Sequence, residues 1–170
     1  MPIRLAVFED CETVVSMVNK VYYSSEKDFW SEGYYRISNE DFNKYLHNNW
    51  LYVLEENKCI IACILFKQEQ KEIASFSMLV CHPDHRKKGI GRKMVSFVTN
   101  QAIKKANKKM YIEILSPKYW IHEEKKFLKT WYVKLGYSLK KEIDFKDYHP
   151  DHVPYMKCDL VFSLYEKSLI

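Results

Sequence analysis

Apolar residues recur along the chain with two different periods, and the period changes from segment to segment. Apolar side chains return every three or four positions, as on one face of a helix, in residues 10–23, 38–48, 90–106 and 122–136. Alternating or continuous apolar runs, typical of strands, occupy residues 3–8, 50–56, 58–67, 72–80, 109–117, 137–143 and 157–167. The predicted order is therefore strand, helix, helix, three strands, helix, strand, helix and two strands.

Local signals fix several of the predicted boundaries. Asp10 stands where the first helix needs an N-cap, and Ser38 with Asp41 three residues later resembles a capping box. Asn57 separates two strand-like runs as a hairpin turn would, and Gly136 ends the last helix. Together these elements predict a mixed α/β domain with a central sheet of about seven strands flanked by about four helices.

Composition narrows the class of protein. A chain of 170 residues with 15% aromatic side chains predicts a single domain over residues 1–170 with a sizeable core. No run approaches the ~20 apolar residues of a membrane span, and the start does not resemble a signal peptide, so we expect a cytoplasmic protein without a membrane partner. The net charge of +5 favours anionic ligands in general.

The five cysteines are Cys11, Cys59, Cys63, Cys81 and Cys158. Their number is odd and no C-x-x-C pair occurs, which indicates free thiols in a reducing compartment. No paired cluster of metal ligands is evident, so we expect no metal. Cys59 and Cys63 lie in an apolar run and are predicted to belong to the core.

Two of the four glycines, Gly89 and Gly91, stand together where a strand gives way to a helix. Glycine permits positive φ and close approach to the backbone, and the first turn of a helix offers unpaired N–H groups, so this junction can cradle a phosphate. Neither common nucleotide-binding glycine motif fits. The alternative is a tight turn with solvated basic residues around it: Arg86, Lys87, Lys88 and Arg92.

This junction resembles motif A of the GNAT acyltransferase superfamily, [QR]-x-x-G-x-[GA], with Arg86, Gly89 and Gly91 in the fixed positions. The segment "TWYVKLGY", residues 130–137, resembles a second family motif, [FWY]-Y-x-[KR]-x-G-[FY]. The predicted order of elements agrees over nearly the whole chain. The resemblance implies a GNAT-type fold and a direct transfer of an acetyl group from acetyl-CoA to an amine.

The resemblance also implies roles for particular residues. The strand before the loop is expected to diverge from the next strand and to pair with the pantetheine arm through Leu79, Val80 and Cys81. The loop amides are expected to hold the pyrophosphate, through Arg86, Lys87, Lys88, Gly89, Ile90, Gly91 and Arg92. Many family members carry Asn where this chain has Lys125, so Lys125 and Ser116 are both candidates for that contact with CoA.

Proton transfer calls for an acid and a base. Tyr132 matches the tyrosine that serves as general acid for the leaving thiolate in the family. Glu113 is the candidate base; the alternative is an outward-facing strand residue. His82, His85 and His122 are weaker candidates, and His122 is expected to cap the last helix.

The acceptor is the least constrained part of the prediction. The family fold implies that residues 24–36 and 145–155 form its walls, and Trp30, Glu32 and Tyr155 are the candidate contacts. Acidic and aromatic side chains would suit a cationic small-molecule amine. A protein acetyltransferase and a non-catalytic acyl-CoA-binding module stay open. A nucleic-acid partner is not expected, because no basic stripe is interleaved with aromatics, and the protein is predicted to be a monomer or homodimer.

Overall fold

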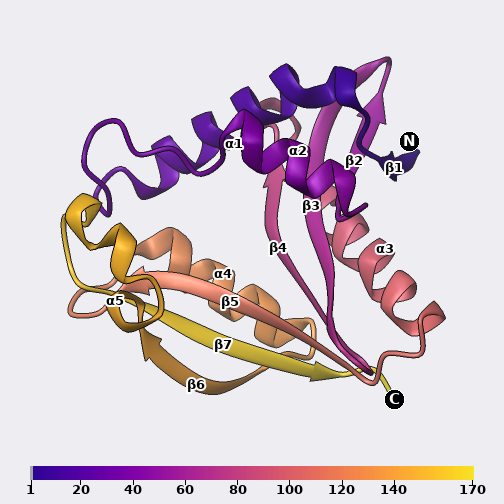
Figure 1. The fold of residues 1–170 in the computed structure, drawn as a ribbon. Coiled ribbons are helices and arrows are strands. Elements are labelled where there is room, and N and C mark those ends of the chain that lie inside the picture. Colours follow the sequence, from indigo (N-terminus) through magenta and orange to yellow (C-terminus); the bar gives the residue numbers. More distant parts are fainter. Residues whose placement is uncertain (1) are drawn as a thin grey trace.

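Seven strands form one mixed sheet in the computed structural model, which describes residues 2–170. The strands are β1 (Ile3–Leu5), β2 (Leu51–Glu56), β3 (Cys59–Gln70), β4 (Ile73–Cys81), β5 (Lys109–Pro117), β6 (Ser138–Asp144) and β7 (Leu160–Ser168). Their spatial order is β1-β2-β3-β4-β5-β7-β6 (Figure 1). All neighbours are antiparallel except β4 and β5, which the crossover through a helix makes parallel.

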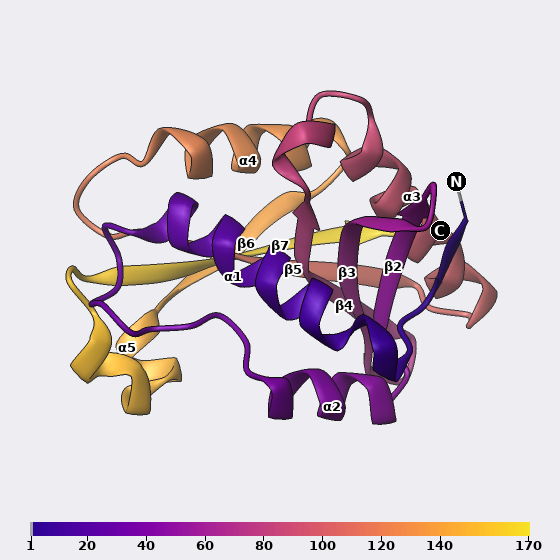
Figure 2. The ribbon, with the colours of Figure 1, turned by 90° about the horizontal axis from the view of Figure 1, so that it is seen from above.

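Helices cover both faces of this sheet. They are α1 (Cys11–Glu26), α2 (Asn39–His47), α3 (Ile90–Lys104), α4 (Glu123–Lys134) and the single-turn α5 (Phe145–Tyr148). Seen from above, α1 and α2 lie on one side and α3 and α4 on the other (Figure 2). The buried side chains form a separate core on each face, with Val14 and Phe42 in one and Met94 and Val98 in the other. Among residues 2–170, no helix has the length and apolar character to cross a membrane.

The predicted boundary signals hold with one exception. Ser38 and Asp41 form the reciprocal capping box, and Asn57 takes a positive φ at the β2–β3 turn. Asp10 stands at the N-cap of α1 but does not cap it with its side chain. Its carboxylate instead accepts hydrogen bonds from the guanidinium of Arg4, at 2.7 and 3.1 Å, and from the backbone amide of Val7. Both carboxylate oxygens of Asp10 are therefore used outside the helix. The α4 helix is capped by His122, as expected.

The prediction that both strand cysteines are buried is half wrong. Cys63 is fully buried in the core beneath α1 and α2, whereas Cys59 is exposed. Cys59 is the first residue of β3, directly after the hairpin turn, where the strand has not yet entered the core.

The sheet opens between its two central strands. β4 and β5 pair at only three positions, Ile73–Lys109, Ala74–Met110 and Ser75–Tyr111, after which they separate (Figure 1). β4 carries one extra residue where the strands separate. Its register against β3 shifts between Ser77 and Val80, and Met78 there has a φ of +52°. Such a bulge bends a strand. The predicted divergence of these strands is thus confirmed, and it leaves a wedge-shaped gap in the middle of the sheet.

Two segments differ from the predicted pattern. α1 continues for three residues beyond the apolar repeat, to Glu26. The stretch of residues 145–155 is folded as α5 followed by a short 3-10 helix, Pro150–Tyr155. Both differences concern the same end of the molecule, where the sheet is open (Figure 1).

Candidate active site

The loop between β4 and α3 is bent twice into the left-handed region. After a 3-10 turn over Pro83–His85, Lys87 has φ +61° and Gly89 has φ +76°. Lys93 donates to the Gly89 carbonyl at 3.0 Å, and no turn or cap bond within the described chain engages the amides of residues 87–92. Consecutive free N–H groups at a helix start form a concave site for an anion.

The surroundings of this loop are cationic. Its four basic side chains are exposed, and none lies within ion-pair distance of a carboxylate in residues 2–170. They are Arg86, Lys87, Lys88 and Arg92. Only Gly89 is required by the backbone conformation, because its φ is positive. Gly91 could be replaced by alanine without strain, since the added methyl group would lie 3.6 Å from Trp131, an ordinary contact distance.

The loop opens directly onto the wedge between β4 and β5. Leu79, Val80 and Cys81 are the last residues of β4 and lie on the arm that has left β5. The facing edge of β5, residues 112–117, has no partner on that side, although its other edge pairs with β7 throughout. Two inner strand edges therefore face each other next to the anion site.

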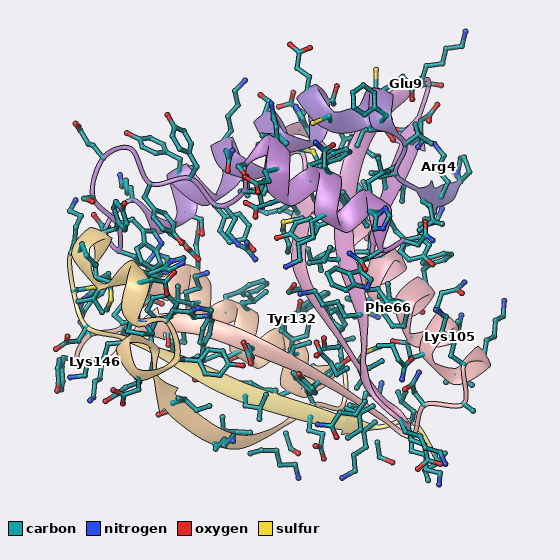
Figure 3. All side chains as sticks on the ribbon, in the orientation of Figure 1. Arg4, Glu9, Phe66, Lys105, Tyr132 and Lys146 are labelled. Atoms are coloured by element: carbon teal, nitrogen blue, oxygen red, sulfur yellow. The ribbon has the colours of Figure 1, made fainter. Side chains whose placement is uncertain are left out.

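Tyr132 lies in this opening, beneath the two strands (Figure 3). Its side chain is only 5% exposed, with ring centroids 5.9 Å from Phe76 and 5.7 Å from Tyr137. No side-chain hydrogen bond within residues 2–170 engages its hydroxyl. Burial, with smaller contributions from Tyr137 and Tyr22, raises the pKa of Tyr132 well above its ordinary value. The phenol is therefore protonated at any physiological pH.

Glu113 is partly buried on β5, near Glu69 of β3 and Tyr148 of α5. Burial raises the pKa of Glu113, and the neighbouring Glu69 raises it further. A hydrogen bond from the Tyr148 hydroxyl and the charge of Lys67 act in the opposite direction. A carboxyl group with a raised pKa is a stronger base once it is ionised.

The two candidates for the additional CoA contact are engaged within the protein. The Lys125 ammonium lies 2.5 Å from the carboxylate of Glu26 in a buried ion pair, in which the side chains are 10% and 5% exposed. The Trp30 indole donates to the other oxygen of Glu26 at 3.0 Å. Ser116 is buried and accepts from Lys129 at 2.9 Å. Their contact with CoA stays a prediction.

The two predicted acceptor walls lie side by side. The Ser31 amide donates to the Tyr155 carbonyl at 2.8 Å, and Trp30 forms an isolated β-bridge with Met156. Aromatic rings hold the walls together, because the Trp30 ring packs edge-on against Phe145 with centroids 5.3 Å apart and the Tyr34 hydroxyl lies 3.1 Å from His152. These contacts join the α1–α2 loop to the segment before β7.

A cavity of about 580 Å³ lies beside this junction, at the end of α1. Its inner lining includes Tyr22, Glu26, Trp30, Tyr34 and Arg36, and exposed residues such as Glu32 stand at its mouth. The volume is in the range of small-molecule sites.

Comparison with known proteins identifies the family. The family model described as "Acetyltransferase (GNAT) domain" matches residues 47–139, more than half of the chain. The chain belongs to the GNAT acetyltransferase family. No curated protein sequence matches it significantly. Acetyl-CoA-dependent acetyl transfer is the general activity of GNAT proteins.

Solved structures share the GNAT fold over the full length of the chain. smu.2055 from Streptococcus mutans UA159 is similar with a TM-score of 0.75 and 19% identity, covering 100% of both chains. The ribosomal-protein-alanine N-acetyltransferase of Brucella melitensis has a TM-score of 0.73 and 14% identity, covering 99% of both. yncA from Salmonella typhimurium, solved with its cofactor acetyl-CoA, has a TM-score of 0.72 and 17% identity, covering 100% of this chain and 94% of that one. At such identities the likeness concerns the fold.

Within this GNAT fold, the sequence analysis missed two residues of the candidate site. Glu26 lies just beyond the apolar repeat of α1, and its partner Lys125 is 99 residues away, so no local pattern could connect them. Arg36 lines the cavity but looked like one of many surface cations. The expected absence of a metal stays a prediction, because His149, Asp151 and His152 could together hold an ion.

Proposed function

We propose that this GNAT protein is an N-acetyltransferase that transfers acetyl directly from acetyl-CoA to a primary amine of a small molecule. One observation carries the proposal: free amides at the start of α3 adjoin a sheet opening into which Tyr132 projects. The volume of the neighbouring cavity, about 580 Å³, supports a small acceptor. A cytoplasmic location, and a monomer or homodimer, stay predictions from the sequence.

The coenzyme would be held mainly by backbone. Amides of residues 87–92 would bind the pyrophosphate, and exposed Arg86, Lys87, Lys88 and Arg92 would add charge around it. The pantetheine arm would enter the wedge and pair with the free edge at Leu79, Val80 and Cys81. Backbone N–H groups of that edge would then stabilise the oxyanion formed at the thioester carbonyl.

Proton transfer would divide between two side chains. Glu113 would take a proton from the acceptor ammonium, directly or through water, and the freed nitrogen would attack the thioester carbon. As the carbon–sulfur bond breaks, Tyr132 would protonate the leaving thiolate, and the remaining extra proton on nitrogen would return to Tyr132 through solvent. The balance is amine plus acetyl-CoA giving amide plus CoA. Trp30, Glu32 and Tyr155 would border the acceptor.

The test is release of free CoA thiol from acetyl-CoA in the presence of polyamines, amino acids, amino sugars and peptides. We expect turnover with at least one small amine, and a fall of about 10²-fold or more in kcat for Tyr132→Phe with unchanged acetyl-CoA affinity. Acetyl-CoA binding without turnover of any amine would indicate a binding module. Turnover confined to peptides would indicate a protein acetyltransferase.

A further inference from the structure

The cavity at the end of α1 contains a cation without a counter-ion. Arg36 is partly buried and lines the cavity, yet no carboxylate of residues 2–170 lies within ion-pair distance of it. The inner acid Glu26 attracts this charge but is not its ion-pair partner, because Lys125 and Trp30 occupy its two oxygens. Retaining an unpaired charge in such a place is costly unless a ligand completes it.

The groups around Arg36 are neutral and aromatic. Its guanidinium carbon lies 5.2 Å from the centroid of the Tyr22 ring, and its charge also acts on the Tyr45 hydroxyl. These contacts orient the guanidinium without neutralising it. Arg36 is among the residues that line the cavity, so its guanidinium can meet a ligand there.

The charges at the mouth of the cavity cancel. Exposed Lys27 and Lys157 stand there with exposed Asp28 and Glu32, two of each sign. The inner part therefore carries one net positive charge, from Arg36. A cavity of this kind favours a ligand that brings a negative group inside, and a planar guanidinium matches a carboxylate through two parallel hydrogen bonds.

We propose that the acceptor amine also bears a carboxylate, as a free amino acid does, and that Arg36 binds this carboxylate. The inference rests on the proposed acetyl transfer and specifies its substrate class. The cavity lies at the end of α1, on the side of the molecule where the sheet is open (Figure 1). An amino acid anchored at Arg36 would hold its amine toward that opening. Polyamines and internal peptide residues lack the required group.

The test compares matched acceptors. Free CoA release is measured for the twenty amino acids, their carboxamides and the corresponding decarboxylated amines. We expect kcat/KM for the best amino acid to exceed that for its carboxamide by about 10- to 100-fold, as for a charge-assisted hydrogen bond. Arg36→Gln should lower kcat/KM for the amino acid far more than for its carboxamide and so remove the preference, and Arg36→Lys should retain part of it.

Lys157→Gln is the matched control, since it removes the same charge from the exposed mouth of the cavity and should leave the preference intact. Thermal unfolding separates a binding role from a structural one: Arg36→Gln should lower Tm by no more than a few degrees, because Arg36 has no carboxylate partner and the variant loses only the ring contact with Tyr22. Equal rates for amino acid and carboxamide, or a preference that survives Arg36→Gln, would overturn the inference while leaving the transferase assignment standing.

A second measurement covers the case in which no amine is acetylated. Amino acids are titrated calorimetrically into the protein loaded with CoA, and into its Arg36→Gln variant. Binding of an amino acid but not of its carboxamide, lost in the variant, would support the carboxylate site even if the proposed acetyl transfer failed. Absence of binding to the CoA-loaded protein would reject the site.

Discussion

Breaking the buried ion pair of Glu26 and Lys125 with a single substitution should destabilise the fold strongly, because one charge is left buried without its partner. The pair joins the last residue of α1 to the first turn of α4, at 2.5 Å, with side chains 5% and 10% exposed. Lys125→Met leaves the Glu26 carboxylate buried with only the Trp30 indole as partner. Removing one member of such a pair costs about 3–5 kcal/mol. In a domain of this length the expected fall in Tm is roughly 6–20 °C.

The assay is urea unfolding followed by tryptophan fluorescence, with Lys126→Met as the control. Lys126 is the next residue of α4 and is exposed, so its replacement should change the free energy of unfolding by less than about 0.5 kcal/mol. The double variant Glu26→Gln/Lys125→Met should recover most of the loss, because neither charge remains. The reasoning fails if Lys125→Met matches Lys126→Met, or if adding Glu26→Gln to Lys125→Met lowers stability further.

Three other outcomes follow from the site. Glu113→Gln should lower kcat by about 10²-fold. The same variant should stabilise the fold at pH 8 but not at pH 4. Folding raises the pKa of Glu113, so the ionised carboxylate destabilises the native state only at pH values above the ordinary pKa of a glutamate. Thermal unfolding at both pH values checks this, and a stability gain at pH 4 would contradict it. Gly89→Ala, at φ +76°, should lower the free energy of unfolding by about 1–2 kcal/mol and weaken acetyl-CoA binding measured by calorimetry. Gly91→Ala should have neither effect, and equal effects of the two substitutions would contradict this reasoning. The pH profile of kcat should show no basic limb from Tyr132 below pH 10, since its pKa is raised; a limb near pH 9 that Tyr132→Phe abolishes would count against this.

Elements with strong local signals were predictable from the sequence. β5 has the predicted bounds, residues 109–117, because its buried positions alternate and Pro117 closes it. The β2–β3 hairpin and the Ser38 capping box follow equally from short-range chemistry. The glycine loop belongs to the same class, since Gly89 marks a backbone conformation that other residues adopt at a cost.

What the sequence could not supply depends on contacts between distant segments. The last turn of α1, residues 24–26, has no apolar repeat and is tied to α4 by Glu26. α5 is a single turn packed through Phe145 against Trp30, too short for a periodic pattern. Arg36 is a charged residue of the kind usually found on the surface. Only the fold reveals that it lines a cavity and has no carboxylate partner among residues 2–170.

The short pairing of β4 with β5 has a consequence for the protein in the cell. Beyond Ser75 and Tyr111, the inner edges of both strands have no partner strand among residues 2–170, so the empty protein lacks part of the hydrogen bonding that an unbroken sheet provides. A coenzyme seated there would repay this deficit, adding about 2.7 kcal/mol when its concentration is a hundred times its Kd. The abundance of folded protein would then rise and fall with the cell's supply of acetyl-CoA.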